Sequence, residues 1–140
     1  MTDLVIDASV AIKWVIEEHG TAEALSLRRH RLFAPELLVA ECANVLWKKT
    51  RRNELTPIEA GLAARLLQRA DIELAPMRAL LEPATELAIA MDHPAYDCTY
   101  LALAESLACD LVTADYKLSA KPLPTGYKSK VLGLTTGALP

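Results

Sequence analysis

Four acidic residues occupy positions that an ordinary solvent-facing carboxylate does not explain: Asp7, Glu41, Asp97 and Asp115. Each lies near the end of a predicted strand or helix, or beside an apolar side of a helix. Carboxylates that are brought together repel one another, so such a cluster lowers stability unless a cation neutralises it. Hard oxygen donors without paired His or Cys favour Mg²⁺ or Mn²⁺ over Zn²⁺. Together the four acids therefore predict a site for a divalent cation.

Asp7 and Asp115 each follow a short apolar run that predicts a buried strand. Leu4–Ile6 directly precedes Asp7, and Leu111–Thr113 is separated from Asp115 by one alanine. Ligand crevices of open α/β sheets form at the carboxyl ends of such strands, which favours a site at both positions. Either residue can also simply cap the helix that follows it. Taken singly, neither residue decides between a cap and a site.

Glu41 lies at helical spacing from Leu37 and Val45, on the apolar side of a predicted helix. A carboxylate in that position is costly unless it is paired or bound to a cation. The alternative is an edge position at which Glu41 extends its carboxylate to solvent or pairs with Lys48 or Lys49.

Asp97 stands in the first turn of a helix predicted over Tyr96–Leu107, after the break at His93-Pro94. It shares a helical side with Leu101, which directs it inward. A helix N-terminus favours a carboxylate by roughly 0.3–1 kcal/mol, so plain capping is the alternative.

Histidine and cysteine add no second metal-binding pattern. The three histidines are dispersed and are predicted to be ordinary surface or loop residues: His19, His30 and His93. The three cysteines share no C-x-x-C spacing and are predicted to be small buried residues in a reducing cytoplasm: Cys42, Cys98 and Cys109.

Short apolar runs alternate with helical patterns, which predicts an α/β domain with a mainly parallel sheet. Strands are predicted at Leu4–Ile6, Leu32–Ala34, Ile72–Leu74, Leu111–Thr113 and Val131–Leu132. Helices are predicted from Val10 to near His19-Gly20, after a cap at Thr21, over Pro35–Lys49, after the capping box Thr56–Glu59, through Leu87 and Ala90, and over Tyr96–Leu107.

Length and composition exclude several classes of protein. The 140 residues suit one domain, and a hydrophobic fraction of 52% argues against disorder. With 15 Lys+Arg against 18 Asp+Glu, the formal net charge of −3 excludes a wholly basic nucleic-acid binder. No apolar stretch is long enough to span a bilayer, and no secretory signal is recognisable at the N-terminus. We therefore expect a cytoplasmic protein without a membrane segment.

Four ordered segments of the sequence resemble the PIN-domain ribonucleases, most closely the VapC-type toxins of type II toxin–antitoxin pairs. These segments are Leu4–Ser9, Ala34–Leu46, Tyr96–Ala104 and Leu111–Asp115. Any one of them is unspecific, whereas the ordered set is specific and covers nearly the whole chain. The resemblance implies a single PIN domain over residues 1–140, with a three-layer α/β/α fold and a central, mainly parallel sheet flanked by helices.

The resemblance also implies the chemistry and the residues that perform it. The implied metal site consists of the four acids, with two supporting polar residues: Asp7, Glu41, Asp97 and Asp115, with Ser9 and Thr113. The implied activity is hydrolysis of phosphodiester bonds in single-stranded or loop regions of RNA by metal-activated water, with Mg²⁺ as cofactor and Mn²⁺ as substitute. Three acids are expected to be direct ligands. Glu41 is expected to act as a ligand, through water, or by helping to deprotonate the attacking water. One or two ions remain equally compatible with the sequence.

The implied partners are RNA, a second copy of the chain and a small cognate antitoxin that covers the active-site groove. Three basic groups could contact RNA or form a solvated surface: Arg28, Arg29 and Arg31; Lys48, Lys49, Arg51 and Arg52; Lys117, Lys121, Lys128 and Lys130. Apolar protein contacts are expected around Val45–Trp47 and Leu62–Leu67. Three aromatic residues on helical stripes are predicted to be core or interface residues: Trp14, Trp47 and Tyr100.

Two other classes of protein share some of these features. A phosphoacceptor receiver domain has similar length and α/β order, but it needs paired adjacent acids after the first strand and a lysine at the end of the last. Asp7 has no adjacent acid, and Asp115 stands where that lysine is needed. A PIN fold that only binds RNA or protein is the other alternative, and the presence of all four acids argues against it.

Overall fold

A five-stranded sheet forms the centre of the molecule. The computed structural model describes residues 1–140, and the strand order is β3-β2-β1-β4-β5 with every neighbouring pair parallel. The strands are β1 (Asp3–Ile6), β2 (Arg31–Pro35), β3 (Glu73–Ala75), β4 (Asp110–Thr113) and β5 (Val131–Gly133). All five predicted strands are present, within one residue at each end. The order also differs from the 2-1-3-4-5 order of receiver domains, which excludes that alternative.

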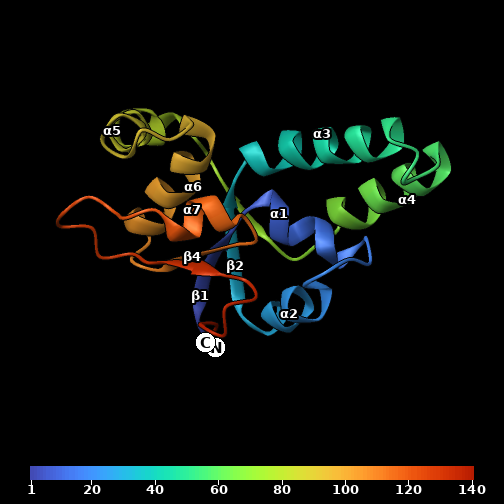
Figure 1. Ribbon diagram of the computed structural model, residues 1–140, viewed down its shortest axis with the longest axis horizontal. Helices are drawn as coiled ribbons and strands as arrows, with labels where there is room; N and C mark the ends of the chain where they lie inside the picture. The colour runs from blue at the N-terminus through green and yellow to red at the C-terminus, as the bar shows by residue number, and fades with distance from the viewer.

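Helices cover both faces of the sheet. The α-helices are α1 (Ala8–Ala11), α2 (Thr21–Ser26), α3 (Leu37–Arg51), α4 (Pro57–Gln68), α5 (Leu81–Met91), α6 (Ala95–Ser106) and α7 (Tyr116–Ala120), and 3₁₀ turns are η1 (Ile12–Trp14), η2 (Leu27–Arg29) and η3 (Arg78–Leu80). Figure 1 shows α1 to α4 on one side of the strands and α5 to α7 on the other. The three-layer α/β/α fold is therefore confirmed. None of these helices combines the length and the hydropathy that crossing a bilayer requires.

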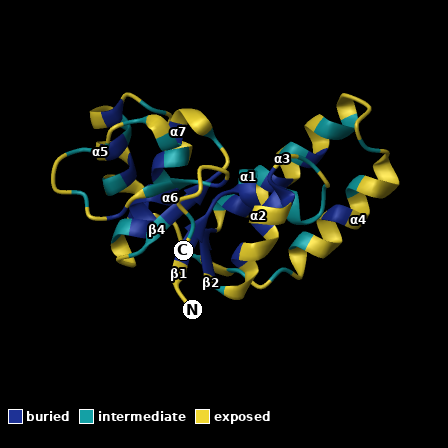
Figure 2. Cartoon of the chain, turned by 60° about the horizontal axis from the view of Figure 1, so that its bottom comes forward, coloured by how far each residue is buried: buried dark blue, intermediate teal, exposed yellow.

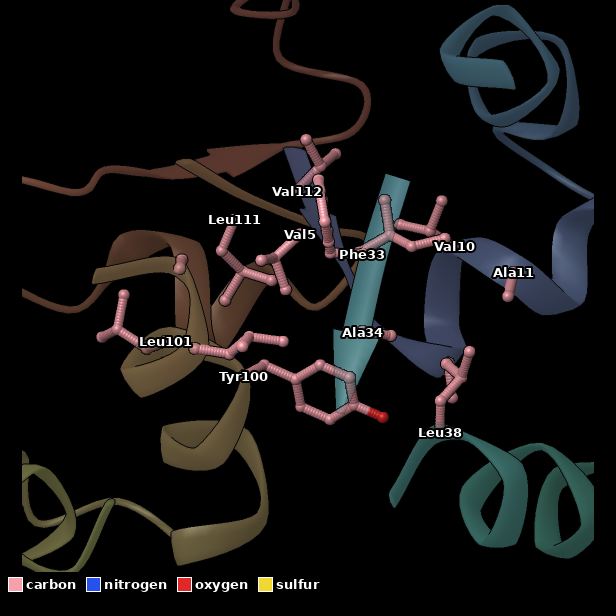
Figure 3. Packing of buried hydrophobic residues seen from close by; sticks show 14 of the residues in the cluster. Val5, Val10, Ala11, Phe33, Ala34, Leu38, Tyr100, Leu101, Leu111 and Val112 are labelled. Carbon is pink, nitrogen blue, oxygen red and sulfur yellow. The ribbon is translucent and has the colours of Figure 1, made fainter. Parts of the chain in front are cut away.

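The core lies along β1 and β4, the two strands at the middle of the sheet. Their apolar residues are buried on both faces, as parallel strands between helical layers must be. Figure 2 shows this buried centre and the largely exposed surface of α4. Figure 3 shows how Leu101 and Tyr100 of α6 meet Val5 and Ala34 of the sheet.

Three predicted helix starts can be compared with the structure. Pro35 was expected in the first turn of a helix, but it ends β2, and α3 begins at Leu37. Proline is tolerated there because the pairing of β2 with β1 ends at Phe33, and on the β3 side Ala75 O accepts from Glu36 N and not from residue 35. Thr21 is the first residue of α2 and not its cap, which is Gly20 at φ 90°. The capping box is confirmed, since Thr56 Oγ1 accepts from Glu59 N at 3.2 Å and Glu59 Oε1 from Thr56 N at 2.8 Å.

The topology brings several element ends to the carboxyl edge of the sheet. The chain passes from β1 to β2 and β3 on one side and later returns to β4 and β5 on the other, so its direction reverses at β1. Open α/β sheets bind ligands at such a reversal. α1 and α3 begin just after a strand ends, while α6 runs back along the sheet before β4, so all three first turns lie near this edge.

Candidate active site

Asp7 lies at the carboxyl end of β1 and is only 6% exposed. It occupies the N-cap position of α1, but its side chain makes no capping hydrogen bond. The carboxylate accepts two hydroxyl groups instead, from Ser9 to Oδ1 and from Thr113 to Oδ2, each at 2.5 Å. The capping alternative is therefore wrong for Asp7.

The two hydroxyl groups are themselves fixed by the backbone of the β4–α7 connection. Ser9 Oγ accepts from Ala114 N at 2.9 Å, and Thr113 Oγ1 accepts from Asp115 N at 3.0 Å. Each hydroxyl has one proton, and these backbone donors leave that proton free to point at Asp7. Ser9 and Thr113 thus hold both oxygens of a buried carboxylate from two different elements.

The charge on Asp7 is nevertheless opposed by its surroundings. Burial raises the pKa of Asp7 from 3.8 to about 6, and the negative charge of Asp97 contributes to the rise. The hydrogen bonds from Ser9 and Thr113 lower the pKa but do not cancel the effect of burial. Such a carboxylate gains from any nearby cation, because positive charge favours its ionised form.

Glu41 projects from α3 toward α6. Its Oε1 accepts from the Tyr100 hydroxyl at 2.5 Å, whereas Lys49 pairs with Glu18 instead. The expected alternative pairing of Glu41 with Lys48 or Lys49 is therefore absent. Burial raises the pKa of Glu41, and the charge of Asp97 raises it further.

Tyr100 is fully buried, and its ring reaches from α6 past Ala34 with the hydroxyl directed toward the α3 side (Figure 3). Burial and the adjacent Glu41 carboxylate raise the pKa of Tyr100, which keeps the hydroxyl protonated as a donor. Tyr100 is a core residue, as predicted, but it also orients a site acid.

Asp97 stands in the first turn of α6, where its Oδ2 lies 2.7 Å from His93 Nε2. The His93 side chain is only 8% exposed, although it belongs to the connection between α5 and α6. His93 is a loop residue, as predicted, but it is not an ordinary one, because its ring is largely buried and bonds to Asp97.

Asp115 follows β4, and its Oδ1 accepts from Lys117 N at 2.9 Å, which caps α7. Its connection to Asp7 runs through Thr113, which accepts from the Asp115 backbone and donates to Asp7. The capping alternative is correct for Asp115, and the capping bond engages one oxygen only.

The structure brings three of the four acids into electrostatic contact. The charge of Asp97 raises the pKa of both Asp7 and Glu41, whereas Asp115 contributes to neither. No Lys or Arg forms an ion pair with any of the four acids. As placed, no three His, Cys, Asp or Glu side chains converge closely enough to hold an ion by themselves.

Sequence reasoning missed the roles of Tyr100 and His93, which contact Glu41 and Asp97. Both carried a signal, because they lie three residues after and four residues before Asp97. A buried tyrosine needs a partner for its hydroxyl, and side chains four residues apart near a helix start can meet. Reading the neighbours of Asp97 at these spacings would have found both.

The basic groups lie at different edges of the sheet. Arg31 begins β2 and Lys130 precedes β5, so these two residues stand at the amino edge, opposite the acids. Arg31 also pairs with Glu73 at 3.2 Å. Lys117 and Lys121, in and after α7, remain on the side of the acids, and Lys48 and Arg51 are in the last turn of α3.

Comparisons with known proteins agree with this geometry. Residues 4–122 match the family model described as PIN domain. The chain is 35% identical over 116 residues to Ribonuclease VapC9 of Mycobacterium tuberculosis, covering 83% of this chain and 88% of that protein. It is 34% identical over 122 residues to Ribonuclease VapC3 of Pyrobaculum aerophilum, covering 84% of this chain and 93% of that protein. The crystal structure of PAE2754 from Pyrobaculum aerophilum matches with a TM-score of 0.66 and 27% identity, covering 85% of this chain and 84% of that one.

Proposed function

The chain belongs to the PIN domain family and, within it, to the VapC ribonucleases, and from this membership we infer that it is an endoribonuclease and the toxin of a toxin–antitoxin pair. The observation that best supports this chemistry is the group of three acids at the carboxyl edge of the sheet, Asp7, Glu41 and Asp97. The charge of Asp97 opposes the ionisation of both Asp7 and Glu41, and no Lys or Arg forms an ion pair with any of the three. Uncompensated carboxylates of this kind are what a divalent ion needs in order to bind beside a phosphate.

We propose Mg²⁺ as the cofactor, with Mn²⁺ as a substitute. The donors are carboxylate and hydroxyl oxygens, which suit hard cations. No three acids lie close enough together to hold an ion without other ligands. Mg²⁺ fits such a site because it keeps several waters and uses one or two carboxylates together with substrate phosphates. We propose Asp7, Asp97 and Asp115 as ligands, with Glu41 completing the site.

The chain contributes by placing these donors. A bound divalent ion supplies charge stabilisation at the phosphate and lowers the pKa of the attacking water. Ser9 and Thr113 hold both oxygens of Asp7, and Tyr100 holds one oxygen of Glu41. His93 contacts one oxygen of Asp97 in the first turn of α6. Rigid elements therefore present each acid, which limits the reorganisation needed when substrate arrives.

We propose that the substrate is single-stranded RNA, or the exposed loop of a structured RNA, and that cleavage is internal. Phosphate contacts position an RNA chain without specifying its sequence. Lys117, one turn from the capping carboxylate of Asp115, is the basic residue best placed for such a contact. The cluster at the end of α3, with Lys48 and Arg51, offers a second contact along the same helix as Glu41.

We propose two protein partners, a second copy of the chain and a cognate antitoxin. α3 and α4 form a hairpin with an apolar cavity of about 360 Å³, lined by Leu38, Val39, Leu46, Ala64 and Leu67 among others. The hairpin also exposes large apolar side chains, among them Trp47, Leu62 and Leu66. This surface suits an apolar helix or extended segment of the antitoxin, which from there would cover the acids.

We further propose that residues 1–140 form one PIN domain and that the protein works in the cytoplasm. One sheet and one buried cluster include residues from Leu4 to Leu134. All three cysteines are free thiols, which suits a reducing compartment.

Expression in a bacterial host tests the toxin assignment. The wild type is expected to arrest growth, and Asp97→Asn is expected to abolish the arrest because it removes a proposed ligand. Asp71→Asn, a change of the same chemistry at an exposed site outside the acid group, should arrest growth like the wild type. Normal growth with the wild type, or equal arrest with Asp97→Asn, would contradict the assignment.

A further inference from the structure

His93 is held at four points in the connection between α5 and α6. Its backbone N donates to Ala88 O at 3.1 Å, and its carbonyl accepts from Cys98 Sγ at 3.9 Å. Its ring contacts Asp97 Oδ2 through Nε2 at 2.7 Å and Lys121 Nζ through Nδ1 at 3.2 Å. Backbone and ring are thus both fixed, and little of the side chain reaches solvent.

The contact with Lys121 determines which ring nitrogen of His93 carries the proton. A lysine ammonium has three donors and no acceptor, so Nδ1 must accept from Lys121 Nζ. The proton of the neutral ring is then on Nε2, which donates it to Asp97 Oδ2.

Lys121 also joins two elements that carry site acids. It directly follows α7, which Asp115 caps, and its Nζ donates to the carbonyl of Asp92 at 2.8 Å. Asp92 ends α5 in the left-handed conformation, one residue before His93. The lysine therefore links the Asp115 segment to the segment that positions Asp97. Figure 1 shows α7 on the same side of the sheet as α5 and α6.

We propose that His93 is a positioning residue for Asp97: Lys121 fixes its Nε2–H tautomer, and the Nε2–H bond to Oδ2 aims the carboxylate at the cation site. The other oxygen of Asp97 accepts no hydrogen bond from the protein, so it is free to act as a ligand. This inference rests on the proposed function, since it concerns the affinity of the same acids for a divalent ion. Hydrogen-bond partners of metal ligands typically change metal affinity about 10–100-fold when they are removed.

Calorimetric titration with Mn²⁺, without RNA, measures this effect directly. His93→Ala is expected to weaken Mn²⁺ binding about 10–100-fold. His93→Gln keeps an N–H near the position of Nε2 and is expected to restore the affinity to within a few-fold of the wild type. His19→Gln, at an exposed histidine, is the matched control and should leave the affinity unchanged. Wild-type affinity in a folded His93→Ala protein would overturn the proposal, and so would His93→Gln binding as weakly as His93→Ala.

The tautomer of His93 provides a second measurement that needs no metal. Long-range ¹H–¹⁵N NMR spectra of the wild type with EDTA are expected to show the Nε2–H tautomer, and Lys121→Met to show a mixture of tautomers. An Nδ1–H tautomer in the wild type would overturn the proposal even if His93→Ala did not fold. A wild type that bound no Mn²⁺ would instead contradict the metal site of the proposed function, and the NMR spectra would still test His93.

Discussion

Asp7 combines the deepest burial of the four acids with a charge that its surroundings oppose. Burial raises its pKa, and two hydroxyl groups orient the carboxylate without neutralising it. An isolated buried charge costs free energy, so the charge on Asp7 lowers the free energy of unfolding when no cation is bound. This loss of stability can be measured, because removal of the charge should abolish it.

Asp7→Asn is expected to stabilise the protein at high pH. The folded pKa, about 6, exceeds the unfolded value of 3.8, so the folded state binds the proton more tightly. The contribution of Asp7 to the free energy of unfolding is therefore fully present below pH 3.8 and is lost as the pH rises through 6. At pH 8 with EDTA, urea denaturation should give Asp7→Asn a free energy of unfolding roughly 1–3 kcal/mol above that of the wild type.

The increase in the free energy of unfolding caused by Asp7→Asn should become smaller as the pH falls from 8 toward 4. Asp71→Asn, at an exposed position, is the control and should show no such dependence. If the wild type were as stable as Asp7→Asn at pH 8, Asp7 would not be a destabilising buried charge.

Tyr100→Phe tests the only hydrogen bond that orients Glu41. The change removes the hydroxyl and keeps the buried ring, so the cost in stability should be about 1 kcal/mol. RNA cleavage should fall about 10–100-fold, as is typical when a partner of a metal-site carboxylate is lost. Tyr116→Phe, at an exposed tyrosine, should leave both quantities unchanged. Cleavage at the wild-type rate by Tyr100→Phe would show that Glu41 needs no such support.

The positions of the acids and the two hydroxyl partners of Asp7 could be predicted from the sequence, but the partner of Glu41 was missed. Asp7 and Asp115 follow apolar runs, and a parallel sheet places the ends of such runs at one edge. The contact between Glu41 and Tyr100 joins residues 59 positions apart on two helices. Whether two such residues meet depends on how the helices pack across the sheet, which local periodicity does not encode.

Strands and capped helices were predictable for a related reason. A strand buried on both faces must be a continuous apolar run, and β1, β2 and β4 are such strands, whereas β3 was predicted from a mixed run and is largely exposed. The predicted start of α3 was wrong because a proline such as Pro35 suits a first helical turn and a strand end equally well.

Thr56→Ala tests the capping box that begins α4. The change removes the acceptor of Glu59 N, so the free energy of unfolding should fall by about 0.5–2 kcal/mol. Cleavage at 25 °C should not change, since α4 carries none of the acids. Thr125→Ala, at an exposed threonine, should alter neither quantity. An unchanged stability in Thr56→Ala would mean that α4 begins without help from this cap.

The net charge of −3 is an average over opposed regions of the molecule. The acids gather at the carboxyl edge of the sheet, and several basic residues stand at the amino edge, where they cannot contact RNA bound over the acids. Only basic residues near the acids, such as Lys117, should add to RNA affinity. An acidic protein can therefore bind RNA through a small number of well-placed contacts.

Lys117→Ala is expected to weaken RNA binding in the non-cleaving Asp97→Asn background. Loss of one phosphate contact should reduce the slope of log K against log salt by about 0.7 for single-stranded RNA. Lys130→Ala removes the same charge at the amino edge and should leave the slope unchanged. Equal effects of both changes would mean that RNA affinity follows net charge and not the position of the lysine.

Cleavage of a labelled RNA with an exposed loop, by purified protein in Mg²⁺ or Mn²⁺, tests the central claim most directly. The wild type and Asp71→Asn should cut the RNA internally, and EDTA should stop both. Asp7→Asn should remain folded and reduce cleavage to background, because it removes the buried carboxylate at the centre of the acid group. Cleavage by Asp7→Asn at the wild-type rate, or wild-type cleavage that persists in EDTA, would contradict a metal-dependent ribonuclease built on these acids.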